Sequence, residues 1–223
     1  SWPLAPVIRI FLINCNLIYF SIFKFLFSIS KFYKDIKLKI KFCRICKSKN
    51  LENVYNLGVM SFTGIFTSSI KDKVPKGELK LIRCKRCTLL QLQNNFDSNL
   101  MYGKNYGYMS SLNKAMEFHL KLKSKYLLDT YKLKKGNSVL DIGSNDGTFL
   151  SFFKKNLKLY ACDPTIKKFK KYYRKDINLT ADFFTGEKFK GLKFNLITSI
   201  AMFYDLPDPL KFANDINSVL TNN

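Results

Sequence analysis

Four cysteines occur in two matched pairs whose spacing suits a metal ion. Two residues separate the cysteines of each pair, and the four are Cys43, Cys46, Cys84 and Cys87. This gap lets both sulfurs of a pair reach one tetrahedral ion at about 2.3 Å. Basic neighbours such as Arg44 and Lys85 favour the thiolate form and offset the charge of the complex. We predict structural zinc, because four protein ligands leave no open position for catalysis.

Two other interpretations of these cysteines are weaker. Four unrelated core cysteines would not fall into matched pairs. A thioredoxin-like redox role requires a single Cys-x-x-Cys motif at the start of a helix, and the sequence predicts no helix there. Of the two remaining cysteines, Cys15 stands alone and Cys162 ends an apolar stretch, where it suits a packed core. So few cysteines in 223 residues argue against a disulfide framework and favour a reducing, cytoplasmic compartment.

A second motif is typical of a strand, a tight turn and a helix. Residues 138–142 read Ser-Val-Leu-Asp-Ile, a short apolar stretch with one acid, Asp141. Residues 143–147 read Gly-Ser-Asn-Asp-Gly, and a helical pattern starts at Thr148. Glycines let the backbone approach a ligand closely at such a turn. Acids at Asp141 and Asp146 disfavour a diphosphate and suit a cationic ligand. We therefore predict S-adenosylmethionine, which carries a sulfonium and an ammonium group, as the cofactor.

The residues after this loop alternate between strand and helix patterns. Three further strands and a helix are predicted at residues 157–162, 177–184, 194–200 and 207–220. Asp163 lies about twenty residues after the loop, where an acid binds ribose hydroxyls. Asp182 is placed to accept from the adenine amino group. Ala201 and Met202 follow the last strand, at the sheet edge where ligands bind.

These patterns predict an α/β fold, in which a small zinc-binding module precedes a partial Rossmann-like methyltransferase domain with about four strands. The predicted cofactor-binding residues are Asp141, Gly143, Ser144, Asn145, Asp146, Gly147, Asp163, Asp182, Ala201 and Met202. We expect a hydrophobic and basic extension, the zinc module, a helical linker with a tyrosine-rich stretch, and the cofactor domain, over residues 1–41, 42–95, 96–135 and 136–223. Short strands are expected at 79–83 and 89–92, and a helix at 111–131.

The N-terminal extension approaches the length of a membrane span. Residues 10–30 carry one charge, at Lys24, and a basic run follows at 31–41. Asn14 and Asn16 argue against a true span, and no small-residue cleavage site marks a secretory signal. We favour a non-native or loosely packed extension, with membrane attachment as the alternative through these residues alone.

The net charge of +22 admits an acidic partner. Only five of the 38 basic residues are arginines, the usual readers of phosphate and guanine, and no basic block dominates after residue 42. We therefore expect no specific nucleic-acid partner. A small acidic substrate such as a sugar nucleotide suits the charge equally well.

Together these motifs resemble the zinc-containing sugar C-methyltransferases, which methylate C3 of nucleotide-linked 4-keto deoxysugars. The resemblance covers about residues 42–220. Its carriers are the cysteine pairs, residues 89–92, 102–119, 139–150, Asp163 and 197–209. It implies a nucleotide-sugar substrate, removal of the C3 proton by a base, and attack of the enolate on the sulfonium methyl. It also implies that Tyr106 or Tyr108 faces the sugar.

The resemblance leaves the catalytic base unassigned. Tyr106, Tyr108 and His119 are the candidates, and His119, the only histidine, fits packing better than catalysis. In the family, the sheet continues and the proposed bases lie beyond the point that corresponds to Asn223, so we expect a truncated chain that lacks the base. Two alternatives stay open: a methyltransferase with another small-molecule acceptor, or a non-catalytic fragment that binds zinc or the cofactor.

Overall fold

The computed structural model describes residues 38–103 and 105–221. The chain divides between Asn105 and Tyr106 into two compact units, within the linker expected at 96–135. Most of the expected N-terminal extension, including the possible span at 10–30, lies outside the described residues. In the described part of the chain, no helix combines the length and apolarity needed to cross a membrane.

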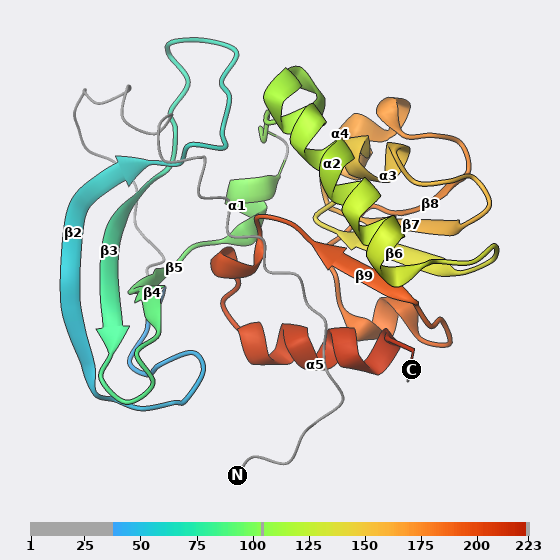
Figure 1. Ribbon diagram of the computed structural model, residues 1–223. Coiled ribbons are helices and arrows are strands. Elements are labelled where there is room, and N and C mark those ends of the chain that lie inside the picture. The colour runs from blue at the N-terminus through green and yellow to red at the C-terminus, as the bar shows by residue number, and fades with distance from the viewer. Residues whose placement is uncertain (1–37, 104, 222–223) are drawn as a thin grey trace. The chain divides into compact units, whose positions relative to one another are not determined.

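The first unit is built on an antiparallel sheet. Its elements are β1 (Leu38–Lys39), β2 (Leu51–Ser61), β3 (Lys76–Cys84), β4 (Leu90–Leu92), β5 (Asn94–Asn95) and α1 (Ser98–Tyr102). β2, β3 and β4 form one sheet in that order, and β1 pairs with β5 (Figure 1). The strands expected at 79–83 and 89–92 correspond to β3 and β4. β2 was not predicted, and its pairing with β3 is interrupted by two register shifts.

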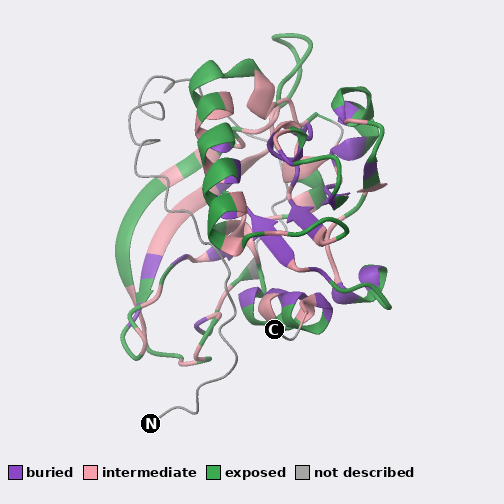
Figure 2. Ribbon diagram, turned by 45° about the vertical axis from the view of Figure 1, so that its right-hand side comes forward, coloured by how far each residue is buried: buried purple, intermediate pink, exposed green. Residues whose placement is uncertain are grey.

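This first unit has a small hydrophobic core. Among its described residues, the buried hydrophobic side chains are Cys43, Ile82 and Cys84. β2 is largely exposed along its length (Figure 2). Two of the three core residues are predicted metal ligands, so the core and the metal site coincide. So little buried apolar surface is typical of small modules that a metal stabilises.

The second unit contains a four-stranded parallel sheet. Its strands are β6 (Ser138–Ile142), β7 (Lys158–Cys162), β8 (Ile177–Thr180) and β9 (Leu196–Ser199), in the order β8-β7-β6-β9. All four lie within one or a few residues of the predicted strands. The chain runs outward from β6 to β8 and then returns to place β9 on the other side of β6. This reversal creates a switch point between β6 and β9, where ligands bind in open α/β sheets.

Helices cover both faces of this sheet (Figure 1). The elements are η3 (Ser110–Leu112), α2 (Lys114–Tyr131), α3 (Thr148–Ser151), α4 (Ile166–Phe169), η4 (Lys170–Tyr172), η5 (Gly186–Phe189), η6 (Phe203–Asp205) and α5 (Pro209–Val219). α2, α3 and α4 pack on one face, and α5 packs on the other. The fold is therefore a three-layer α/β/α arrangement.

Side-chain alternation along the strands produces the two cores. Val139 packs with α2 and α3, whereas its neighbour Leu140 packs with α5. In β7, Leu159 and Cys162 divide between the faces in the same way. The prediction that Cys162 is a core residue is confirmed, because it is almost fully buried. The central strands β6 and β9 are almost entirely buried (Figure 2).

The long helices begin at polar caps. Asn113 Oδ1 accepts from the backbone N–H groups of Ala115 and Met116 at the start of α2. Asp208 caps α5, whose first residue is Pro209. The helix expected at 111–131 therefore begins at Lys114, and the residues before it form the 3-10 turn η3.

Candidate functional site

The four paired cysteines converge on one point. Their Sγ atoms all lie within 4.8 Å of one another. Cys43 and Cys87 are 3.5 Å apart between sulfurs, as are Cys46 and Cys84. Four sulfurs at about 2.3 Å from a tetrahedral zinc ion are separated by about 3.8 Å. The cluster therefore fits zinc with all four positions filled by protein, as predicted.

Both cysteine pairs use the same local turn. The N–H of Lys47 donates to the carbonyl of Cys43 over 3.0 Å, and that of Thr88 donates to Cys84 over 2.8 Å. Lys47 and Thr88 occupy matching positions, and both have left-handed backbones, with φ of 58° and 63°. Backbone N–H groups of Cys87 and Arg86 lower the pKa of Cys84 to about 6. A lowered pKa favours the thiolate that zinc requires.

Arg44 links the first cysteine turn to the sheet. Its guanidinium donates to the carbonyl of Leu92 over 2.6 Å and to Asn95 Oδ1 over 2.6 Å. Gln91 Oε1 accepts from both the backbone and the side chain of Arg44. Burial lowers the pKa of Arg44. The residue thus has a structural role besides the charge balance expected from the sequence.

The glycine-rich loop leaves β6 at the switch point. Gly143, Asn145 and Gly147 have left-handed backbones, with φ of 76°, 52° and 79°. The N–H of Gly143 donates to the carbonyl of Cys162 over 2.8 Å, so the loop begins alongside the end of β7. A Cβ atom at Gly147 would lie 2.6 Å from the ring of Tyr173. Glycine is therefore required at this position by both conformation and space.

Two buried acids lie beneath the loop. Asp141, 3% exposed, accepts from Thr198 Oγ1 over 2.7 Å, and burial raises its pKa to about 7. Asp163, 8% exposed, accepts from the N–H of Asn145 over 2.8 Å and from Thr165. Burial also raises the pKa of Asp163. Both acids carry a desolvation cost that a cationic or hydroxyl-bearing ligand would offset.

Asp146 has a different environment from the one the sequence suggested. It is 1% exposed, and one carboxylate oxygen accepts from the N–H and Oγ1 of Thr148. The other oxygen accepts from the N–H of Ser111 over 3.0 Å. Both oxygens are thus engaged within the protein. A direct contact from Asp146 to the cofactor stays a prediction.

The remaining predicted cofactor residues lie in or beside the carboxyl edge of the sheet. Ser144 Oγ is 2.8 Å from Tyr173 Oη, within the loop. Asp182 follows β8 and pairs with Lys188 over 2.8 Å. Met202 follows β9, and its Cγ would lie 3.2 Å from a Cβ atom at Gly143. Ala201, which precedes it, is left-handed with φ of 55°.

The predicted substrate-side residues lie in a stretch that we call the tyrosine segment, residues 106–112. Lys168 Nζ donates to the carbonyl of Tyr106 over 2.8 Å. Burial, followed by the charge of Asp163, raises the pKa of Tyr106 above its usual value. Tyr106 is half-buried and Tyr108 is exposed. The structure therefore brings Tyr106 into electrostatic reach of a predicted cofactor residue.

His119 lies in α2. Its Nε2 is buried and makes no hydrogen bond to any described residue. This environment suits the packing role that the sequence favoured. A role of His119 as catalytic base stays a prediction, and no described residue forms a hydrogen bond with its Nε2.

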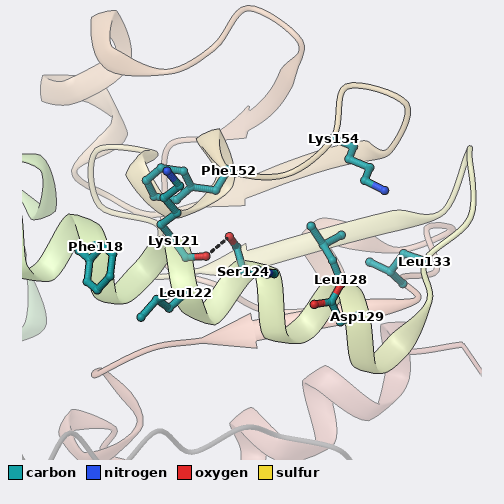
Figure 3. A pocket seen from close by; sticks show the side chains of 10 residues that line it. Phe118, Lys121, Leu122, Ser124, Leu128, Asp129, Leu133, Phe152 and Lys154 are labelled. Carbon is teal, nitrogen blue, oxygen red and sulfur yellow. Dashed lines mark hydrogen bonds between the residues drawn. The ribbon is translucent and has the colours of Figure 1, made fainter.

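A surface depression of about 510 Å³ runs along α2 (Figure 3). It is lined by apolar side chains such as Phe118, Leu122 and Phe152, together with lysines. None of the predicted cofactor, metal or catalytic residues lines it. The candidate site is thus defined by the loop and its acids and not by this depression.

Sequence reasoning missed the polar residues that hold the acids. Thr198 binds Asp141, Thr165 binds Asp163, and Tyr173 Oη donates to the carbonyl of Asn145 over 2.7 Å. Thr198 lies within an apolar strand and Thr165 follows one. A hydroxyl at either position could have indicated a hydrogen bond to a nearby acid. Tyr173 carried none, because its role depends on the fold.

Comparisons with known proteins agree with this division of the chain. Residues 43–102 match the family described as "Putative zinc binding domain". Residues 114–223 match the family described as "Methyltransferase domain". One part of the chain is thus similar to zinc-binding domains and a second part is similar to methyltransferase domains. The predicted fold class is confirmed, and the family matches, with the four-cysteine cluster, support zinc and S-adenosylmethionine as its cofactors.

The individual relatives are distant. C-methyltransferase NovU from Streptomyces niveus is 26% identical over 125 residues, which cover 54% of this chain and 29% of that protein. This chain therefore spans less than a third of that curated relative.

Solved structures show weaker likeness. The plantazolicin methyltransferase BpumL in complex with SAH aligns with a TM-score of 0.43 and 18% identity, over 49% of this chain and 46% of that one. Coclaurine N-methyltransferase bound to N-methylheliamine and SAH aligns with a TM-score of 0.38 and 15% identity, over 57% and 39%. Scores this low carry no inference about the substrate.

Proposed function

We propose that this protein is an S-adenosylmethionine-dependent methyltransferase. The observation that carries the proposal is the left-handed loop at 143–147, which lies at the switch point of a parallel sheet above two buried acids. The match of residues 114–223 to methyltransferase domains supports it. When bound, the cofactor supplies a methyl group activated by a sulfonium.

The residues of the site have separate roles in this proposal. Asp163 accepts from the ribose hydroxyls, and Asp182 accepts from the adenine amino group. Gly143 lets the backbone approach the ligand beside Met202. Asp141 stays under the loop, where Thr198 holds its carboxylate. Each assignment follows from position at the carboxyl edge of β6, β7, β8 or β9.

Zinc has a structural role in this proposal. All four ligands are protein thiols, so no coordination position is open to a substrate. A reducing, cytoplasmic compartment keeps the thiols available to the metal.

For the acceptor, we propose a nucleotide-linked keto-deoxysugar that is methylated on carbon. Three observations support this choice: the match to a C-methyltransferase, the net charge of +22, and the tyrosine segment beside the predicted cofactor residues. A diphosphate-bearing sugar suits the positive charge. The alternatives from the sequence remain another small-molecule acceptor or a non-catalytic fragment.

Cofactor binding is tested by calorimetric titration of the zinc-loaded protein with S-adenosylmethionine and S-adenosylhomocysteine. We expect saturable binding of both. Asp182→Ala should weaken it by about tenfold, since a hydrogen bond to a charged group contributes about 1.5 kcal/mol or more. Asp176→Ala is the matched control, because Asp176 is also ion-paired but precedes β8 at the opposite edge of the sheet. Folded, zinc-loaded protein that binds neither ligand would refute the proposal.

The acceptor is tested with a methyl-labelled cofactor. Label in a nucleotide-linked 4-keto deoxysugar, and not in its 4-hydroxyl counterpart, would support this acceptor, because the 4-hydroxyl sugar cannot form an enolate. Exchange of the C3 hydrogen in deuterium oxide, measured without cofactor, reports separately on a base. Cofactor binding without transfer or exchange would favour the non-catalytic alternative.

A further inference from the structure

The side chain of Asn145 faces the tyrosine segment. Its Oδ1 accepts from the N–H of Ser110 over 2.9 Å, and its Nδ2 donates to the carbonyl of Tyr108 over 3.0 Å. Both polar ends of the amide are therefore used on residues that lie 35 and 37 positions earlier in the chain. An amide that makes two backbone hydrogen bonds fixes the segment more tightly than a packing contact would.

Two further hydrogen bonds attach the same segment to the cofactor side of the unit. Asp146 accepts from the N–H of Ser111, and Lys168 donates to the carbonyl of Tyr106. Adjacent loop residues thus hold adjacent residues of the segment. The start of the tyrosine segment is held from α4, and its end is held from the glycine-rich loop.

The backbone of Asn145 is also held by Asp163, a residue predicted to bind the cofactor. Asp163 accepts from the backbone N–H of Asn145 over 2.8 Å. A continuous path of hydrogen bonds therefore runs from Asp163 through Asn145 to Ser110 and Tyr108. The left-handed backbone of Asn145, with φ of 52°, directs its side chain out of the loop toward the segment.

We propose that Asn145 and Asp146 are positioning residues that couple occupation of the cofactor site to the order of the tyrosine segment. The inference rests on the proposed function, since it takes the loop to be the cofactor site and the segment to be the acceptor side. A ligand that fixes the loop stabilises the hydrogen bonds that hold the segment. The acceptor side is then completed when the cofactor is bound.

Linkage gives this coupling a quantitative signature. In the attached state, the hydrogen bonds between the loop and the tyrosine segment are formed. If a ligand raises the equilibrium constant for attachment by some factor, loss of attachment must lower the affinity for that ligand by the same factor. Two independent measurements should therefore agree. One is the slowing of amide exchange in the segment on ligand binding, and the other is the loss of ligand affinity when the side chain of Asn145 is removed.

The test compares the full zinc-loaded protein with Asn145→Gly, using S-adenosylhomocysteine as the probe. Glycine suits the left-handed backbone, so the variant removes the side chain without strain. In the unsubstituted protein, we expect the ligand to slow hydrogen–deuterium exchange of the Ser110 and Ser111 amides by threefold or more. In Asn145→Gly, exchange of the Ser110 amide should be faster, the effect of the ligand on it should vanish, and the dissociation constant should rise by a similar factor. The Ser111 amide keeps its own acceptor, Asp146, and should change less.

Lys132→Gly is the matched control. Lys132 ends α2 with a left-handed backbone, φ 45°, so the change again places glycine where the conformation favours it. Exchange in the segment and ligand affinity should both stay as in the unsubstituted protein. Thermal unfolding of each variant shows that it is folded before exchange is compared.

The outcomes separate this proposal from the one on which it rests. Ligand binding that leaves exchange at Ser110 and Ser111 unchanged overturns the coupling and leaves the methyltransferase proposal standing. Equal slowing by the ligand in both proteins also overturns it, because Asn145 would then not transmit the effect. No binding by the folded, unsubstituted protein overturns the proposed function and the coupling together.

Discussion

The cysteine turns and the glycine-rich loop both depend on left-handed residues, yet they use different amino acids. In the loop, two of the three left-handed positions are glycine, at Gly143 and Gly147. In the cysteine turns, the matching positions are Lys47 and Thr88, which carry the steric cost of that conformation. The loop must admit a close approach of other atoms, whereas a metal can hold a strained turn in place.

The two units also differ in what stabilises them. The second unit has two hydrophobic cores, one on each face of its sheet. Among its described residues, the first unit has three buried hydrophobic side chains, of which two are predicted metal ligands. The comparison predicts that metal loss unfolds the first unit and leaves the second intact.

Cys84→Ser should have the largest effect. Structural zinc contributes about 10–16 kcal/mol of apparent binding free energy in small metal-folded modules. We expect the variant to lose zinc and to become susceptible to proteolysis within residues 38–105, while the second unit resists. Zinc stoichiometry and mass spectrometry of the fragments measure both results.

Cys162→Ser is the matched control for that change. Cys162 is equally buried but lies in the parallel sheet, outside the metal cluster. The variant should keep its zinc and lose stability only through the cost of a buried hydroxyl. Full zinc content and unchanged proteolysis in Cys84→Ser would contradict the four-thiolate site.

Gly147→Ala should have the next largest effect. The left-handed backbone costs about 1–2 kcal/mol with any side chain, and overpacking against Tyr173 adds about 1–3 kcal/mol. Gly136→Ala isolates the first contribution, because Gly136 has φ of 84° and nothing within 4 Å of its added Cβ. Urea unfolding of the second unit should separate the two variants. Equal destabilisation by Gly147→Ala and Gly136→Ala would mean that the ring of Tyr173 moves away from the added methyl group. The glycine-rich loop would then be less tightly packed than its geometry indicates.

The sequence predicted most of this architecture because the relevant signals are local. The spacing within each cysteine pair indicates a metal-binding turn, and the short, largely apolar stretches at 138–142 and 194–200 are typical of buried strands. β2 escaped prediction because Asn53, Asn56 and Gly58 break its alternation, and its register is irregular. Pairing with β3 decides its conformation, and pairing is not visible in a single segment.

The structure brings several of the predicted site residues together, and their roles stay predictions. Asp141 and Asp163 lie beneath the loop, as their places at strand ends indicated. The directions of Asn145 and Asp146 could not be predicted, because their partners lie 35 residues or more earlier in the chain. Side-chain direction in a turn is a tertiary property.

Asp141→Asn tests the electrostatics of the loop. Burial raises the pKa of Asp141 from 3.8 to about 7, so between these values the folded state holds a proton that the unfolded state has lost. Stability of the ligand-free second unit should therefore fall as pH rises from about 4 to about 7. The amide should reduce this dependence, with a gain of up to about 4 kcal/mol at pH 8, at 1.36 kcal/mol per pKa unit, and the raised pKa of Asp163 accounts for part of what remains.

Denaturation of both proteins at pH 5 and pH 8 measures this effect. Asparagine can still accept from Thr198, so the hydrogen bond of the buried group is kept. Asp176→Asn is the control, because its ion pair with Arg174 lowers the pKa of an exposed acid. Parallel pH profiles for Asp141→Asn and the unsubstituted protein would show that Asp141 stays charged in the folded state.

Thr88→Gly should have the smallest effect, and it should be stabilising. Thr88 is β-branched and left-handed, a combination that costs about 1–2 kcal/mol. Glycine removes this cost, but it raises the entropy of the unfolded chain, so the net stabilisation is smaller. We expect tighter zinc retention against a chelator by a few fold. Lys47→Gly should gain less, since lysine is not β-branched. Both changes also remove a hydrogen bond to a backbone carbonyl, from Lys47 to Arg44 and from Thr88 to Cys87. Weaker zinc retention in both variants would show that the side chains of Lys47 and Thr88 stabilise the cysteine turns. Backbone strain would then not be the difference between the cysteine turns and the glycine-rich loop.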